Sequence, residues 1–227
     1  MLYLALACLQ GRPQQDAWSE LWELEPDGIQ LTPGNVPTDG FEELVAGSGR
    51  PVRFHHGFAW RQRRRRPWPR PGRALTKPHP DWSVHPPSRH EWTSLDDVLS
   101  AALTAGLILE TMPPACWLGE GDELVAALNA GVPLAVDVAH LFLQLEAGKL
   151  TRSVLHRVLD SDAIAEVHVS QNDGRGDLHE PLQADAFGLG WARERLAAGT
   201  PVILESYFHR IDTDERRRQL ELLRGDA

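Results

Sequence analysis

Residues 134–146 read Leu134-Ala-Val-Asp137 followed by Val138-Ala-His140-Leu-Phe-Leu-Gln-Leu-Glu146. The first four residues form a short apolar run that ends in an acid, which is typical of a buried strand whose carboxyl end carries a functional group. From Ala139 to Glu146 the apolar side chains recur at helical spacing. The segment therefore predicts a strand followed by a helix, the repeating unit of a parallel α/β fold.

Short apolar runs recur along the whole chain at spacings of about 24 to 37 residues, each followed by helix-like or loop sequence. A strand is predicted in each of eight runs: Leu2 to Ala7, Gly28 to Leu31, Val52 to His55, Trp82 to His85, Leu107 to Glu110, Leu134 to Asp137, Ala165 to Val169 and Val202 to Glu205. Helices are expected at Ser94 to Leu103, Asp122 to Asn129, Ala139 to Glu146, Thr151 to Leu159, Leu189 to Ala198 and Thr213 to Leu223. This alternation predicts a short (β/α)8 TIM barrel that forms a single domain over residues 1–227.

The third unit departs from the pattern. Gly57 to Pro80 is rich in Arg, Pro and Trp and has little helical period, so a long loop is expected after the third strand, on the side of a barrel where active sites form. It contains Arg61-Gln-Arg-Arg-Arg-Arg-Pro-Trp-Pro-Arg70 and extends to Arg73. The run is either a solvated loop or an anion-binding loop over a site.

Composition indicates a globular, soluble protein. Hydrophobic residues make up 42% and charged residues 24% of the chain, and no apolar stretch has the length of a membrane span. The apolar start, Met1 to Cys8, has no preceding basic residue and is better explained as a strand than as a secretion signal. Cys8 and Cys116 form no metal-binding or disulfide pattern, and a cytoplasmic location is expected. The net charge of -9 argues against nucleic acid as a general partner.

Four predicted strands end in residues that can bind a metal: Glu110, Asp137, His168 and Glu205. Each residue alone is explained as readily by helix capping or an ion pair. Strand ends in a barrel converge on one mouth, however, so the three carboxylates and the imidazole would meet there and suit a divalent cation. Without a cation the carboxylates would repel one another.

Further candidate ligands surround these four. His140 follows Asp137 by about one helical turn, Asp177 and His179 form an Asp-x-His pair in a loop, and His85 ends the fourth strand. At the third strand either His55 or His56 could face the mouth.

In order and spacing, the Glu110 strand, Asp137-x-x-His140, His168 followed by Asn172-Asp-Gly-Arg-Gly-Asp177-Leu-His179, and Ile203-Leu-Glu205 resemble the xylose-isomerase-like TIM-barrel superfamily. This superfamily contains sugar phosphate isomerases, epimerases and endonuclease IV-like proteins, and the resemblance spans about residues 28–208. It implies a metal site of Glu110, Asp137, His168 and Glu205. Members similar to endonuclease IV hold further ions, for which this chain offers His55 or His56, His85, His140, Asp177 and His179. The chain departs from those members by its length, its acidity and Pro87.

The resemblance favours an isomerase or epimerase and leaves two alternative functions open. An isomerase or epimerase of a small hydroxy-carbonyl compound would use Glu110 and Glu205 as proton-transfer groups, with Arg175 binding the substrate. A multinuclear phosphodiesterase would use the Arg61–Arg73 loop along a phosphate backbone and Trp60 or Phe58 against a base. A multinuclear non-haem iron enzyme would oxidise a peptide or small molecule.

All three functions require one to three divalent ions of Zn, Mn or Fe. A small-molecule substrate is favoured, with His56, Trp60 and Arg175 as candidate substrate-binding residues. Nucleic acid or peptide partners would bind through the basic loop.

Overall fold

The computed structural model describes residues 1–71, 73, 79 and 81–225. Within these residues eight parallel strands form a closed barrel in which each strand pairs with the next and the last returns to the first. This arrangement confirms the predicted (β/α)8 barrel. The strands are β1 (Leu2–Ala5), β2 (Gly28–Leu31), β3 (Val52–His55), β4 (Trp82–Val84), β5 (Ile108–Glu110), β6 (Leu134–Asp137), β7 (Ile164–Val169) and β8 (Val202–Leu204).

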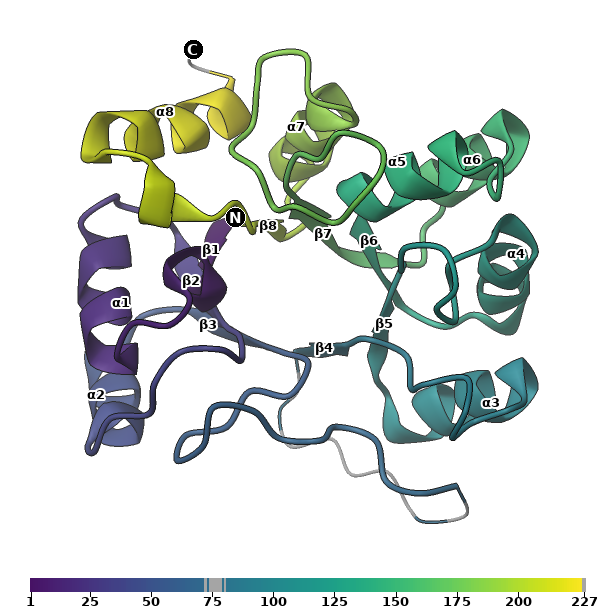
Figure 1. Cartoon of the computed structure of the whole chain (residues 1–227), viewed down its shortest axis with the longest axis horizontal. Helices are drawn as coiled ribbons and strands as arrows, with labels where there is room; N and C mark the ends of the chain where they lie inside the picture. The colour runs from purple at the N-terminus through teal and green to yellow at the C-terminus, as the bar shows by residue number, and fades with distance from the viewer. Residues whose placement is uncertain (72, 74–78, 80, 226–227) are drawn as a thin grey trace.

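Helices surround the strands on the outside (Figure 1). They are α1 (Gln14–Trp22), α2 (Phe41–Ser48), α3 (Leu95–Ala105), α4 (Gly121–Ala130), α5 (Val138–Glu146), α6 (Arg152–Leu159), α7 (Leu189–Ala197) and α8 (Thr213–Arg224), with short 3₁₀ helices η1 (Leu6–Leu9) and η2 (Phe208–Arg210). In the part of the chain that is described, no helix is both long and apolar enough to cross a lipid bilayer.

The observed bounds agree with the predicted ones to within about two residues, the usual uncertainty of an element's end. Ser94 caps α3 as expected, accepting a hydrogen bond from the Asp97 amide at 3.2 Å. The sequence analysis did not identify α1 and α2. Helix α2 contains Gly47, a poor helix former, and it is stabilised by tertiary packing because Phe41 and Val45 are buried beneath it.

The described residues between β3 and β4 contain no helix. Figure 1 shows this connection running through the arc between α2 and α3, where a regular barrel would have another helix. Trp68 links this loop to the end of β4, because its indole N–H donates to the carbonyl of His85 at 2.7 Å. Residues 72, 74–78 and 80 of this predicted loop lie outside the described part of the chain.

Side chains alternate along each strand between the helices and the barrel interior. Outward-facing Leu109 and Val136 are buried among the apolar side chains of the helices. The interior is unusually polar and contains the buried side chains Gln30, Arg53, Ser83 and Glu166. Because residues two apart on a strand face the same side, this polar layer lies directly below the strand-end residues His55 and His168.

Gly28 supplies a test of the barrel's packing. A Cβ atom at this position would lie 2.2 Å from Cε1 of Tyr3 and 2.9 Å from the carbonyl oxygen of Pro51. We therefore expect Gly28→Ala to lower the free energy of unfolding by about 1–3 kcal/mol, measured by urea denaturation. Gly47→Ala is the control, because nothing lies within 4 Å of its Cβ position and helix α2 should gain up to about 1 kcal/mol. Equal stability of the two variants would contradict this packing.

Candidate metal centre

The carboxyl ends of six successive strands, β3 to β8, bring ionisable side chains to one mouth of the barrel. His55, Glu110, Asp137 and His168 stand on β3, β5, β6 and β7, and His85 and Glu205 directly follow β4 and β8. His140 extends from the first turn of α5, and the loop after β7 adds Asp177 and His179. The structure thus brings together all nine residues that the sequence analysis selected as metal ligands; their role as ligands remains a prediction.

Glu110 lies at the centre of this cluster and is only 1% exposed. Its Oε2 atom is 3.2 Å from Nε2 of His55, 3.2 Å from Nε2 of His85 and 3.7 Å from Nδ1 of His168. Its Oε1 atom is 3.3 Å from Nδ1 of His140. One carboxylate therefore lies beside four imidazoles from four different segments of the chain.

The first of three groups of candidate ligands consists of His55, His85 and Glu110. The two Nε2 atoms are 3.2 Å apart. Ligand atoms that each lie about 2.1 Å from one ion are about 3.0–3.4 Å from one another, so these atoms have the spacing of a coordination shell.

The second group consists of Glu110, Asp137, His168 and Glu205. Nδ1 of His168 is 3.3 Å from Oε1 of Glu205. Asp137 is the N-cap of α5 through Oδ1, which accepts from the His140 amide at 3.0 Å. Capping accounts for only one oxygen of this carboxylate, and Oδ2 remains available to a cation.

The third group consists of His140, Asp177 and His179. Nδ1 of His140 donates to the carbonyl of Thr111 at 2.7 Å, which leaves Nε2 as the ring nitrogen that can bind a metal. Oδ2 of Asp177 is 3.2 Å from that Nε2 atom and 3.4 Å from Nε2 of His179. The Asp-x-His segment is not regular extended chain, because His179 has a φ of 48°.

Several buried atoms of this cluster have no hydrogen-bond partner within the described residues. They are Glu110 Oε2, Asp137 Oδ2, His140 Nε2 and His168 Nδ1. Buried polar atoms are normally satisfied, and orphaned ones require an explanation such as an ion. These four are carboxylate oxygens and imidazole nitrogens from adjoining elements, the donor set of Zn, Mn or Fe. The residues therefore fit a divalent metal centre.

The protonation of the cluster shows how strongly it attracts positive charge. Burial opposes the charged form of His168, but Glu205 and Glu110 outweigh it and hold the imidazole pKa well above its usual value. For His179, burial is likewise outweighed, chiefly by Asp177, and the pKa rises to about 9. Burial raises the pKa of Asp137 to about 6. Protons and metal ions compete for these atoms, so metal binding must release protons.

His55 and His56 have separate positions at the mouth, which answers the question left by the sequence. His55 directs Nε2 into the centre, whereas His56 stacks on the His85 ring with centroids 4.1 Å apart. Nε2 of His56 accepts a hydrogen bond of 2.6 Å from the Arg64 guanidinium. Burial, together with His85 and Arg64, lowers the pKa of His56 to about 3, so this ring is neutral.

A cavity of about 160 Å³ opens over the centre. Gln10, Thr32 and Tyr207 line it beside the candidate ligands. Sequence reasoning missed these three residues. They follow β1, β2 and β8, so the rule used for the other strand ends could have found them, but their side chains are not typical metal ligands.

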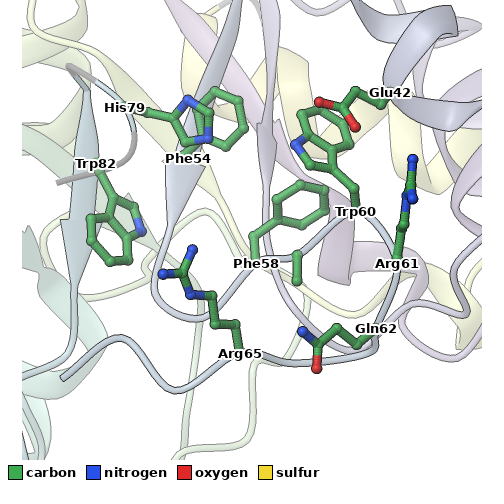
Figure 2. Close-up of a pocket in the computed structure, with 10 residues that line it drawn as sticks. Glu42, Phe54, Phe58, Trp60, Arg61, Gln62, Arg65, His79 and Trp82 are labelled. Atoms are coloured by element: carbon green, nitrogen blue, oxygen red, sulfur yellow. The ribbon is translucent and has the colours of Figure 1, made fainter. Parts of the chain in front are cut away.

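Two predicted substrate-binding residues lie elsewhere. Arg175 is exposed and is not among the residues that line the mouth. Trp60 lines a separate cavity of about 400 Å³, shown in Figure 2, with Phe54, Phe58 and Trp82. Both residues lie in loops, whose course strand periodicity does not fix, and their role in substrate binding stays a prediction.

Comparisons with known proteins agree on the fold. The chain matches no protein-family model and no curated protein. A D-tagatose 3-epimerase-like protein aligns over 99% of this chain and 96% of its own, with a TM-score of 0.61 and 12% identity. The TTHB071 protein from Thermus thermophilus, whose crystal was soaked with ZnCl2, aligns over 100% of this chain and 98% of its own, with a TM-score of 0.57 and 17% identity. These likenesses confirm the expected TIM-barrel fold.

Metal addition should stabilise the folded chain. We expect ZnCl2 added to chelator-treated protein to raise Tm, because a ligand bound only by the folded state at a hundredfold excess over Kd contributes about 2.7 kcal/mol. Glu110→Gln should remove most of this shift, since Glu110 belongs to two of the groups. The exposed His156→Ala variant is the control and should keep the shift. A parental Tm that does not respond to Zn, Mn or Fe(II) would contradict the metal assignment.

Proposed function

We propose that this chain is a metal-dependent enzyme whose centre holds more than one divalent ion and which hydrolyses a small phosphate ester. The observation that carries the proposal is that the candidate ligands form three groups and that Glu110 belongs to two of them. Both oxygens of Glu110 are directed at imidazoles. A carboxylate in this position suits a bridge between two cations, whose mutual repulsion it offsets.

The bound ions would supply Lewis acidity and lower the pKa of water, which provides a nucleophile at neutral pH. The protein's own contribution is orientation. Thr111 fixes the ring of His140 through its carbonyl, and the N-cap bond of Asp137 fixes that carboxylate. Both bonds are buried, so the ligands are held in place before the substrate arrives.

The rim of the mouth supports an anionic substrate. Arg64 is exposed, and its partner at the mouth is the neutral ring of His56 rather than a carboxylate. Its charge therefore remains available to a phosphate oxygen. The loop is held over the mouth by the Arg65 amide, which donates to the Gly57 carbonyl at 2.6 Å. A Cβ atom on Gly57 would lie 2.0 Å from the carbonyl oxygen of Arg65, so glycine permits this approach.

A sugar isomerase or epimerase is the second candidate, favoured by the fold shared with the D-tagatose 3-epimerase-like protein. That reaction needs Glu110 or Glu205 free to exchange a proton with carbon. The imidazoles around Glu110 argue against this role for it. The same His-rich donor set also suits iron, so redox-active iron in the purified protein would favour an oxidative enzyme instead.

Metal stoichiometry separates these functions. We expect elemental mass spectrometry to find more than one ion per chain, and Asp177→Ala/His179→Ala to lose one ion while retaining those near Glu110. The control is His156→Ala/Asp162→Ala, which removes the same side-chain types from exposed positions around the end of α6. If the parental protein holds a single ion and the double variant Asp177→Ala/His179→Ala retains it, the result would favour the isomerase.

Charge at the rim gives a kinetic test. Arg64→Gln should weaken inhibition by inorganic phosphate and raise KM for a phosphate ester about tenfold or more, because a charge-assisted hydrogen bond is lost. Metal content should not change. Arg63→Gln removes the same charge one residue away, where no side-chain contact ties it to the mouth within the described residues, and it should change KM less than twofold. Equal effects of the two variants would indicate that the arginine run is a solvated loop and not an anion-binding one.

A further inference from the structure

We propose that Glu166 is a positioning residue that fixes the hydrogen-bonded state of two imidazoles, His168 and His55, so that each turns a bare ring nitrogen toward the metal centre. This inference rests on the metal-dependent function proposed above. Glu166 is not one of the nine candidate ligands.

Glu166 stands on β7 two residues before His168, so both side chains point into the barrel. It is completely buried below the metal centre. Its Oε2 accepts from Nε of Arg53 at 2.7 Å and forms an ion pair with Nη2, also at 2.7 Å, and its Oε1 accepts from Gln30 at 3.2 Å. Two-point pairing with a guanidinium stabilises the ionised carboxylate, which can only accept hydrogen bonds.

The first imidazole is oriented directly. Nε2 of His168 lies 2.9 Å from Oε1 of Glu166. Because the carboxylate can only accept, Nε2 must carry the hydrogen. The other nitrogen, Nδ1, is buried without a hydrogen-bond partner and lies 3.3 Å from Glu205. Glu166 thereby makes Nδ1 the nitrogen available to a metal in the second group.

The second imidazole is oriented through Ser83. The Ser83 side chain hydrogen-bonds to Glu166 and lies 2.9 Å from Nδ1 of His55. Serine has one hydroxyl hydrogen. Because the carboxylate can only accept, Ser83 must donate this hydrogen bond to Glu166. The serine oxygen must then accept from Nδ1–H of His55, which leaves Nε2 bare at 3.2 Å from Glu110. One carboxylate therefore orients a ligand in each of two groups.

The competing explanation is that Arg53 and Glu166 form only a structural ion pair across the barrel. Ser83→Ala separates the two explanations, because it cuts the connection to His55 and leaves the ion pair intact. Asp81→Asn is the matched control: it removes a second, exposed carboxylate 3.9 Å from Arg53 and leaves the Glu166 network unchanged.

The experiment combines two measurements on the full chain. Nitrogen NMR of the metal-free protein reports which ring nitrogen of His55 carries the hydrogen, and chelator competition with Zn²⁺ reports the affinity for each ion. We expect Ser83→Ala to abolish the preference for Nδ1–H at His55 and to weaken the ion held by His55 about 10–100-fold. The ion held by His168 should keep its affinity, and Asp81→Asn should match the parent in both measurements.

The direct variant Glu166→Gln leaves Arg53 buried without its partner and is expected to be strongly destabilised. The double variant Arg53→Met/Glu166→Gln removes both charges, and it should weaken the ion held by His168 about 10–100-fold. Parental NMR signatures and affinities in Ser83→Ala and in the double variant would overturn the positioning role. If the parental protein binds no metal but Ser83→Ala changes the tautomer of His55 as described, the proposed function fails and the orientation of His55 stands.

Discussion

Closure of a wholly parallel barrel is the constraint on which the candidate site depends. Leu2 pairs with Val202 and Leu4 with Leu204, so β8 returns to β1 in register. Because all strands run in one direction, their carboxyl ends form one ring, and residues far apart in the sequence meet there. His55 and Glu205 come from opposite halves of the chain, yet a ligand atom of one lies within 4.8 Å of a ligand atom of the other.

Much of the fold could be predicted because its strands are short apolar runs bounded by acids, histidines or turns. The prediction for Leu134–Asp137 matches the structure residue for residue. Helices α1 and α2 were not identified, since their stability comes from packing that a local pattern does not reveal. Trp18 of α1 is buried against its neighbours, and its ring lies 6.0 Å from that of Phe41 in α2. Contacts between helices of different units are set by closure of the barrel and not by the local sequence of either helix.

The sequence could place candidate ligands at the mouth but could not say which atom each one presents. That choice is made by distant residues: the Thr111 carbonyl for His140, and Ser83 for His55. The loops were harder still. Gly57 and the left-handed backbone of His56 fold the basic run back over the mouth and set Arg64 against His56. Neither strand alternation nor charge patterning contains that information.

The polar barrel interior has an energetic meaning. A layer of aliphatic side chains would stabilise the barrel better, because a buried ion pair rarely recovers the cost of removing two charges from water. Arg53 and Glu166 occupy such a layer, immediately below the candidate ligands, whereas side chains such as Leu109 and Val136 form apolar packing on the outer faces of the strands. The fold can tolerate this loss because side chains such as Leu109 and Val136 are buried against the helices. The proposed orientation of His168 and His55 would explain why a charged pair occupies a layer in which aliphatic side chains would stabilise the barrel more.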